Sequence, residues 1–487
     1  MGAANRIGVR RRGCIAVRRL SGSDSMFIFS ENRNRHQHTL KIAVIDPCGA
    51  DVLVTYDSLR DQIREALPLL EPFRWRLVRV PFDLGHPFWV NAPLLDLDYH
   101  IQRVAVSAPG GPRELAEVIS EIASVGLERD RPLWQVWFVD GIADGHVAYV
   151  TKVHHSLADG MASERLLADA FGERPEDTPM GSTEPLETER IPGRWHLVWI
   201  GLIDVAKMVA ALPALLVRTA RALKRSRRHM RRQNEVPVKP FAGPHTRFDD
   251  ALTPNRWLAY ETFDLAAIKF VAKTFGAGVN DVVVAMAAGA LRNYLMARGE
   301  LPEKSLTAAI PVSVRAPDEE RAWGNHTTTW YVTLATSVQN PTERFQTIMR
   351  STNAARREME ASDAQLQSAW AEYWRLFRLV TFGVPKIARP FIRRPSYNAI
   401  VSSVPGPKVP LYRHGARLVH MISMGPLVEG IGINFTGWSY AGEMTIAVMA
   451  CRERAPDIWD LSTALQLSLK ELTDAAEVLQ RESPKHA

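Results

Sequence analysis

Two adjacent histidines, His154 and His155, are the residues whose type and spacing point most directly to chemistry. They belong to the segment V-H-H-S-L-A-D-G, which runs from Val153 to Gly160 and includes Asp159. A neutral imidazole can take a proton from a hydroxyl near neutral pH, because its unperturbed pKa is about 6.5. The segment therefore indicates general base catalysis.

Other chemistries are less well supported by the same segment. Ser156 follows the histidines, but no G-x-S-x-G turn is present to expose a serine nucleophile. Zinc requires three or four convergent ligands, and the three cysteines are far apart while no His-x-x-x-His pair occurs here. We therefore expect no metal. The histidines and Asp159 can also form a purely structural cluster, and the segment alone leaves that alternative open.

The histidines end a predicted strand over residues 146–155, where the side chains alternate with a period of two. Adjacent residues of a strand project to opposite faces, so we expect one histidine to be catalytic and the other to support it. Helical spacing resumes after Gly160. Asp159 could cap that helix or hold an arginine, and either contact would keep the turn in place.

The composition is that of a folded protein with more than one domain. The chain has 487 residues, 46% hydrophobic and 23% charged, which suits two domains of roughly 200 residues each. A net charge of +7 favours a polyanionic partner, such as nucleic acid, anionic lipid or a phosphorylated molecule like coenzyme A. Three unclustered cysteines indicate a reducing, cytoplasmic setting.

The order of patterns predicts four segments. Residues 1–17 are basic without the apolar run of a secretory signal, so we expect a flexible extension. Residues 18–190 alternate strand-like and helical stretches and predict a first αβ domain. Residues 191–240 are predicted to be an amphipathic basic linker helix, and residues 241–487 a second αβ domain.

The linker helix has an unusual distribution of charge. Residues 195–217 are nearly all apolar, whereas residues 218–232 contain eight Lys or Arg and no acid. A membrane-spanning helix would place Asp204, Lys207 and Pro213 inside the bilayer. We therefore expect the helix to lie in a membrane surface, with its arginines on anionic head groups. The alternative is a helix packed between the two domains with a solvated basic end.

Three further stretches complete the prediction for the second domain. A helix is predicted from Asn280 to Gly299, and a strand from Leu306 to Arg315. Residues 371–395 mix aromatic and basic side chains, which suits a second membrane contact or the wall of a tunnel.

H-H-x-x-x-D-G is the signature of acyltransferases that resemble chloramphenicol acetyltransferase, the peptide synthetase condensation domains and the carnitine acyltransferases. Further segments spread along the chain carry a closer resemblance: RLSGSDSMFIF from Arg19, PFRWRLVRVPFDLGHPFWV from Pro72, LDYHI from Leu97, LERDRPLWQVWFVDG from Leu127, VNDVVVA from Val279, IPVSVR from Ile310, GN at Gly324 and Asn325, and SSVPGP from Ser402. Through these segments almost the whole chain resembles the bacterial wax ester synthase/diacylglycerol acyltransferase family. Two departures are Glu128, where the family more often has Asp, and Ser403, where it has Asn.

The resemblance implies an α/β fold with two chloramphenicol-acetyltransferase-like domains facing each other across a central tunnel. It implies that the second histidine, His155, is the base, with His154, Asp159 and Gly160 in support. Long-chain acyl-CoA would be the acyl donor, without any other cofactor, and diacylglycerol the acceptor. The enzyme would be cytoplasmic and peripherally associated with the inner face of the plasma membrane or with lipid bodies.

Several other residues of the matching segments are candidates with two interpretations. Pro132, Leu133 and Trp134 either shape the wall of the site or belong to the core. Asn280 and Asp281 either cap the helix that begins there or contact substrate, and we favour the cap. The candidate oxyanion donors are Ser402, Ser403 and the backbone amide of Gly406.

Two other functions remain possible from the sequence. A wax ester synthase would use a long-chain fatty alcohol in place of diacylglycerol. A catalytically silent lipid-binding or membrane scaffold protein would keep the tunnel and lose the reaction. Nucleic-acid binding is disfavoured, because the basic run lies beside an apolar helix and lacks interleaved aromatic residues.

Overall fold

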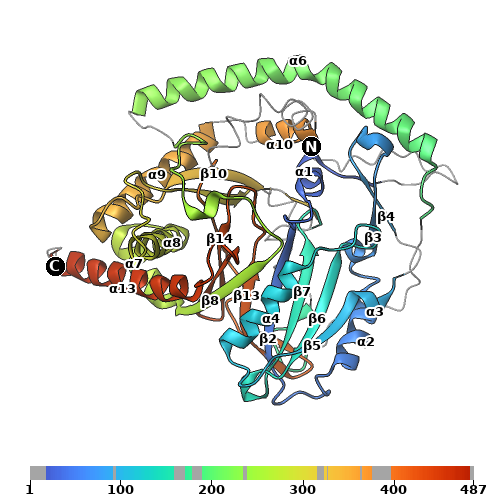
Figure 1. Ribbon diagram of the computed structural model, residues 1–487, viewed down its shortest axis with the longest axis horizontal. Coiled ribbons are helices and arrows are strands. Elements are labelled where there is room, and N and C mark those ends of the chain that lie inside the picture. The colour runs from blue at the N-terminus through green and yellow to red at the C-terminus, as the bar shows by residue number, and fades with distance from the viewer. Residues whose placement is uncertain are drawn as a thin grey trace.

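Two six-stranded β-sheets form the framework of the protein within the residues that the structure describes (Figure 1). The structure is a computed structural model, which describes residues 18–91, 95–157, 170–177, 189–233, 238–314, 323–325, 327–361, 365–375 and 396–482. The predicted α/β class with two sheet-containing domains is confirmed.

The first sheet has the strand order β12-β13-β2-β7-β6-β5. Only β5 and β6 are parallel neighbours in it. Its central strand β7 corresponds to the predicted strand 146–155 and is buried along nearly its whole length. The strands are β2 (His38–Asp46), β5 (Ile101–Ala105), β6 (Trp134–Asp140), β7 (Val147–His154), β12 (Tyr412–Arg413) and β13 (Ala416–Met424).

The second sheet has the order β10-β9-β11-β14-β15-β8. Its strands are β8 (Arg256–Asp264), β9 (Thr307–Ser313), β10 (Thr327–Thr333), β11 (Ala399–Val404), β14 (Ile433–Tyr440) and β15 (Glu443–Cys451). The helices packed with it are α7 (Leu265–Phe275), α8 (Val279–Met296), α9 (Pro341–Ala361) and α13 (Trp459–Glu482). The predicted helix from Asn280 and strand from Leu306 are thus α8 and β9. Because α8 is apolar on nearly every side, it lies buried in this core.

The two sheets are not separate in sequence. Strands β12 and β13 come from the last quarter of the chain, yet β13 pairs with β2 in the first sheet. In Figure 1 the orange β13 lies beside the blue β2. The division at residues 190 and 240 stays a prediction, and the strand pairing shows that residues 412–424 complete the first sheet.

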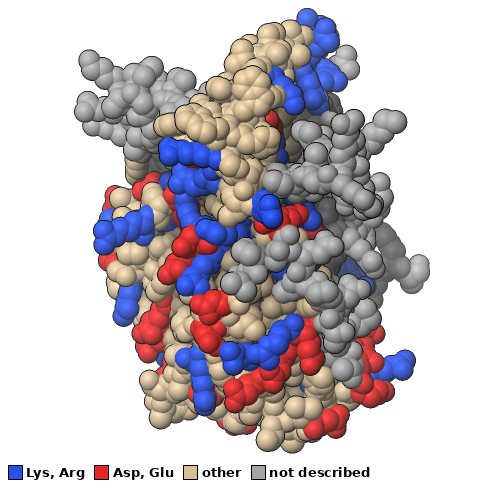
Figure 2. All heavy atoms as spheres, turned by 90° about the vertical axis from the view of Figure 1, so that its right-hand side faces the viewer, with Lys and Arg blue, Asp and Glu red and all other residues tan. Residues whose placement is uncertain are grey.

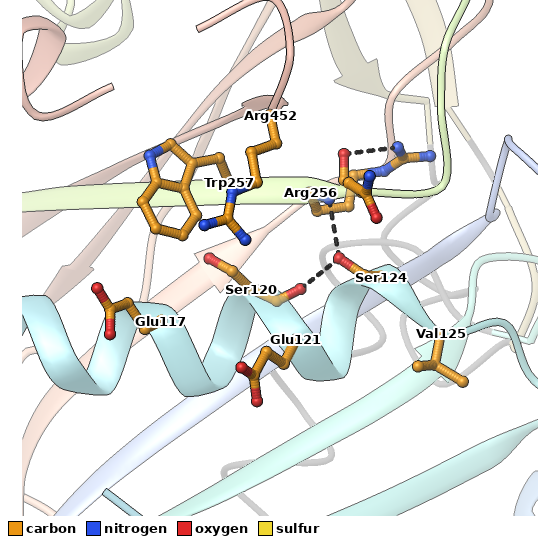
Figure 3. Close-up of a pocket in the computed structure, with 9 residues that line it drawn as sticks. Glu117, Ser120, Glu121, Ser124, Val125, Arg256, Trp257 and Arg452 are labelled. Carbon is orange, nitrogen blue, oxygen red and sulfur yellow. Dashed lines mark hydrogen bonds between the residues drawn. The ribbon is translucent and has the colours of Figure 1, made fainter. Parts of the chain in front are cut away.

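Helix α4 (Pro112–Ser124) joins the two halves at an edge of the second sheet. Strand β8 is the last strand there, so its outward amides need partners. The amide of Leu258 donates to Ser120 Oγ at 3.0 Å, and that of Arg256 donates to Ser124 Oγ at 2.8 Å (Figure 3). Two hydroxyl groups therefore satisfy the edge strand, and a cavity of about 420 Å³ lies beside them.

Smaller elements cover the first sheet. They are α1 (Gly22–Ser30), α2 (Tyr56–Ala66), α3 (Leu97–His100) and a three-stranded sheet of β1 (Arg18–Arg19), β4 (Phe88–Asn91) and β3 (Trp75–Val78). Helix α10 (Gln365–Ala371) lies next to α1.

The predicted linker helix is α6 (Arg194–Gln233), one helix of 40 residues that contains Pro213. It arches over both halves of the molecule (Figure 1). Leu197 packs among the side chains of β3 and β4, while Trp370 Nε1 donates to Thr219 Oγ1 at 3.0 Å. Within the described residues, the part Arg194–Arg225 is long and apolar enough to cross a membrane; α7 and α8 qualify only as one span bent by 101°.

Candidate active site

The two histidines lie where β7 leaves the first sheet. His154 is the last residue of the strand, and His155 begins the turn that follows. The amide of His154 donates to the Leu133 carbonyl at 2.9 Å, and the amide of His155 donates to the Gln37 carbonyl at 2.7 Å. The amide of Leu157 then donates to the His154 carbonyl at 3.0 Å. The segments before β6 and β2 thus hold the backbone of both histidines.

His154 is completely buried, and its ring has a defined orientation. Nδ1 accepts from the Ser156 amide at 3.2 Å and lies 2.7 Å from Ser156 Oγ. An acceptor at Nδ1 leaves the proton of a neutral imidazole on Nε2. Nε2 lies 3.6 Å from Glu31 Oε2. This geometry suits a supporting residue.

The Glu31 carboxylate is held in its charged form. Burial alone would raise its pKa, but the adjacent His154 ring, the charge of Arg129 and the bond from the Gln37 amide lower the pKa to about 2. Arg129 donates to Glu31 Oε2 at 2.8 Å, and the Gln37 amide donates to Oε1 at 3.1 Å. A carboxylate with these donors is a fixed negative charge beside the buried histidine.

His155 is half-buried, so it has accessible surface while its neighbour has none. Its ring stacks on that of Phe27, with centroids 4.2 Å apart and planes 6° from parallel. Phe27 belongs to α1. The imidazole is therefore held flat against a helix of the first half of the chain.

Asn325 reaches the same turn from the second half of the chain. Its Nδ2 donates to the His155 carbonyl at 2.5 Å and to Asp24 Oδ1 at 2.8 Å. Its own amide donates to Asp24 Oδ1 at 2.9 Å. The preceding Gly324 has a φ of +95°, and its amide donates to the Leu157 carbonyl at 3.1 Å. Both residues of the GN motif therefore donate hydrogen bonds to carbonyls of the turn that contains His155.

Two residues of α1, Asp24 and Phe27, and its C-cap residue Glu31 contact this site. Asp24, Phe27 and Glu31 follow one another at spacings of three and four, which places them along one stripe. In the sequence this segment is evident only as a match to a family, and no role for its residues follows from that match. The spacing of Asp24, Phe27 and Glu31 was the sequence feature that could have indicated that they contact the site together.

Three basic side chains bind the carbonyl end of α4. His36, His38 and Lys152 donate to carbonyl oxygens of its last turn, which suits the negative end of a helix dipole. The accepting carbonyls belong to Ile122, Ala123, Ser124 and Val125. Burial lowers the pKa of Lys152 to about 7 and that of His36 to about 4, and it also lowers the pKa of His38. This cluster fixes α4 against the strand that carries His154.

The P-L-W segment lies in the core. Pro132, Leu133 and Trp134 are all buried. Trp134 stacks on Phe73 at 4.8 Å and donates from Nε1 to the Phe73 carbonyl at 2.7 Å. Its indole is therefore occupied by protein contacts, and the segment touches the site through the bond from the His154 amide to Leu133.

The other candidates lie in the second half. Asp281 Oδ2 accepts from the Gly278 amide at 2.9 Å, which is the capping role, and Asn280 lies in the same first turn of α8. Ser402 and Ser403 are half-buried residues of β11, opposite Thr436 and Gly437 of β14.

The Gly406 amide donates to Ser439 Oγ at 3.1 Å. Asp159 and Gly160 lie outside the described residues, as does most of the stretch 371–395.

The described part of the chain contains no group of three or more His, Cys, Asp or Glu side chains able to hold a metal ion. The cavity beside α4 and β8 is lined by side chains such as Glu117, Arg256, Trp257 and Arg452. Figure 3 shows the Arg452 side chain beside Trp257, over whose ring its guanidinium lies. None of the predicted site residues lines it, so it is distinct from the histidine site.

Comparison with known sequences identifies relatives along the whole chain. The profile of the wax ester synthase/diacylglycerol acyltransferase catalytic domain matches residues 20–283, and that of the WS/DGAT C-terminal domain matches residues 323–473. A putative diacylglycerol O-acyltransferase of Mycobacterium tuberculosis H37Rv is 35% identical over 465 residues, covering 94% of this chain and 97% of the relative. A second from that strain is 32% identical over 474 residues, covering 96% and 92%.

Solved structures give the same result for the fold. The wax ester synthase/diacylglycerol acyltransferase of Marinobacter aquaeolei VT8 is similar with a TM-score of 0.68 and 27% identity, over 94% of this chain and 99% of that one. The first condensation domain of the calcium-dependent antibiotic synthetase has a TM-score of 0.57 at 14% identity, over 95% and 97%. The second likeness concerns the fold alone.

Proposed function

The chain belongs to the wax ester synthase/diacylglycerol acyltransferase family, and we propose that it transfers a long-chain acyl group from coenzyme A to diacylglycerol with His155 as general base. Profiles of both family domains match it, and it shares 35% identity with a relative over nearly the full length of both chains. It is therefore an acyltransferase. The donor, the acceptor and the base are the parts proposed here.

In the proposed reaction, His155 Nε2 takes the proton of the acceptor hydroxyl while the hydroxyl oxygen attacks the thioester carbonyl carbon. The tetrahedral intermediate then expels the coenzyme A thiolate, and the imidazolium returns the proton to sulfur. The C–O ester bond forms, the C–S bond breaks, and the base ends as it began. General base catalysis contributes about 10² to 10⁴ in rate, and positioning both substrates adds to it.

The difference in burial between the two histidines carries this assignment. His154 is completely buried, with Nδ1 accepting from Ser156. His155 has accessible surface, and its ring and carbonyl are both fixed by contacts. A base must meet a substrate proton and also hold its orientation, and His155 combines the two properties.

Replacing His155 by Ala tests the assignment. Purified variants would be given labelled palmitoyl-CoA and diolein, with His146→Ala as a matched control at the opposite end of β7. We expect His155→Ala to lower kcat by about 10² to 10⁴ and the control to leave it unchanged. Wild-type turnover by His155→Ala would refute the role of this residue, and no transfer by the wild-type protein would favour the lipid-binding scaffold.

A competition between acceptors tests diacylglycerol against fatty alcohol. Equal amounts of diolein and hexadecanol would be supplied with labelled palmitoyl-CoA, and the products separated by thin-layer chromatography. We expect triacylglycerol to exceed wax ester. The reverse ratio would favour the wax ester synthase, an activity that the Marinobacter relative carries in its name.

We further propose that α6 rests on an anionic lipid surface, at the inner face of the plasma membrane or on lipid bodies. Its outer side carries the strongly exposed Trp195 and Trp199, at 81% and 64% exposure. Other exposed apolar residues follow along α6: Leu202, Ile203, Val209, Leu216, Val217 and Leu223. Figure 2 shows the top of the molecule, where α6 lies, as a largely uncharged ridge, whereas charges of both signs cover the body below.

The inner side of α6 supports a surface position over a spanning one. Leu197 and Thr219 contact the body at positions 22 residues apart, so the helix axis follows the protein surface. Crossing a bilayer would break these contacts and bury Asp204 in hydrocarbon. In a surface position, the exposed Arg221, Arg225 and Arg228 meet anionic head groups, each contributing about 1 kcal/mol.

Vesicle flotation tests the lipid contact in the full chain. The double variant Trp195→Glu and Trp199→Glu would be compared with Leu53→Glu, which alters an equally exposed apolar residue outside α6. We expect the wild type and the control to float with phosphatidylglycerol-containing vesicles, and the double variant to remain at the bottom. Equal flotation of all three proteins would refute the proposal.

A further inference from the structure

The ring of Phe27 stacks on that of His155, the proposed base. We propose that Phe27 is a positioning residue for His155, which fixes the plane of the imidazole and stabilises the imidazolium formed during transfer. The proposal rests on the assigned role of His155 and adds a residue to it. In this role Phe27 acts through the histidine, the ring on which it stacks.

The helix that carries Phe27 is held at both ends, so the ring is fixed before substrate arrives. At the N-terminus, Ser21 Oγ accepts from the Asp24 amide at 3.1 Å, and the Gly22 amide donates to Glu372 Oε1 at 2.6 Å. A Cβ on Gly22 would lie 2.3 Å from the Glu372 backbone nitrogen, so only glycine permits this approach. At the other end, Glu31 is held by Arg129.

The stack leaves the chemistry of the imidazole unobstructed. The two rings are nearly parallel at 4.2 Å, so Phe27 covers one face of the His155 ring. The lone pair of the basic nitrogen and the N–H bond of the other nitrogen both lie in the plane of the neutral imidazole, and neither points toward that face. Phe27 can therefore restrain rotation of the ring without competing for the proton that His155 accepts.

The electrostatics of the stack favour the charged form of the histidine. The face of an aromatic ring carries partial negative charge and attracts a cation within about 6 Å of its centroid. Imidazolium exists only after His155 has taken the hydroxyl proton. An interaction that is stronger at that stage than with neutral imidazole lowers the barrier to transfer, because it is gained on the way to the transition state.

Phe27→Leu tests the proposal, because leucine keeps apolar volume and removes the aromatic face. The control is Phe29→Leu, a buried phenylalanine of the same helix whose ring lies near His86. Phe27→Tyr is the conservative variant expected to restore activity. The measurement is the pH dependence of kcat/KM for palmitoyl-CoA, together with kcat and KM separately.

We expect Phe27→Leu to lower the plateau of kcat/KM about 3- to 30-fold through kcat. The acid limb should move to lower pH by about half a unit to one unit, because the imidazolium has lost a stabilising contact. Phe29→Leu should leave the limb in place, and Phe27→Tyr should return both values to those of the wild type. An unmoved limb in Phe27→Leu would overturn the proposal.

A second measurement separates this proposal from the role of His155 as base. Reaction of His155 with diethyl pyrocarbonate, followed by mass spectrometry across a pH series, reports the neutral fraction of that imidazole without turnover. A shift of this titration in Phe27→Leu supports the stack even if His155→Ala stays active. An unshifted titration together with an inactive His155→Ala keeps the base and overturns the role of Phe27.

Discussion

Asn325→Ala tests most directly whether the second half of the chain holds the base in place. The side-chain amide donates to the His155 carbonyl at 2.5 Å and to Asp24 Oδ1 at 2.8 Å. Alanine removes both bonds but keeps the backbone bond from residue 325 to Asp24. The two acceptors would remain in a largely buried place without this donor.

The expected loss follows from the two bonds. A hydrogen bond to a charged group contributes about 1.5 to 3 kcal/mol, and one to a carbonyl about 1 kcal/mol, so the free energy of unfolding should fall by about 2.5 to 4 kcal/mol. For a domain of roughly 200 residues this lowers Tm on the order of 10 °C. Loss of the anchor should also lower kcat about 10- to 100-fold, because small displacements of a catalytic group are costly.

The assay compares melting temperature with kcat measured well below it. The control is Asn398→Ala, since Asn398 is buried in the same half of the chain and its side-chain amide is also hydrogen-bonded on both the nitrogen and the oxygen. Its Nδ2 donates to the Pro244 carbonyl at 2.7 Å, and its Oδ1 accepts from the Thr307 amide at 3.0 Å. We expect both variants to lose stability and only Asn325→Ala to lose kcat. Wild-type kcat in Asn325→Ala would refute the idea that Asn325 holds His155 in position for catalysis.

Three further substitutions test individual contacts. Gly324→Ala should destabilise the protein by about 1 to 3 kcal/mol and lower kcat, because φ is +95° and the new Cβ would lie 3.0 Å from Asp24 Oδ2; an unchanged urea midpoint would contradict this. Trp134→Phe should cost about 1 to 3 kcal/mol through the lost bond to Phe73 and leave kcat and KM unchanged, whereas a raised KM would indicate substrate contact. The pKa of His36 is lowered to about 4, so the unfolded chain binds more protons from about pH 6.5 down to 4, and stability is lost as the pH falls through that window. His36→Gln should remove about 3 kcal/mol of this loss in melts between pH 7 and pH 4, and an equal decline in both proteins would refute the assignment.

Local patterns predicted those elements whose structure depends on their own residues. The strand at 146–155 and the helix from Asn280 are β7 and α8, since alternation and apolar composition are properties of short windows. The adjacent histidines on a strand also predicted that only one would serve a given cavity. The structure agrees to the extent that His154 is buried and His155 is accessible.

Local sequence patterns could not predict the contacts between segments that are far apart in the chain. The pairing of β13 with β2 joins residues more than 370 apart, and nothing local in either strand specifies the partner. The contact between Asn325 and the His155 carbonyl is of the same kind. Both motifs were visible as segments in the sequence, but their meeting depends on how the two sheets are placed.

The short helix α1 explains why the base depends on both halves of the chain. A helix of nine residues has little stability of its own, so its position is set by contacts at its ends. At its start, Glu372 accepts from the Gly22 amide and from Arg19, and Arg19 also donates to Asp204 of α6 at 2.7 Å. The inner face of α6 thus helps to place the helix that stacks on His155, while its outer face carries the exposed apolar residues of the proposed lipid contact. Changes on the inner face should therefore reach the histidine, and changes on the outer face should alter only where the enzyme is held.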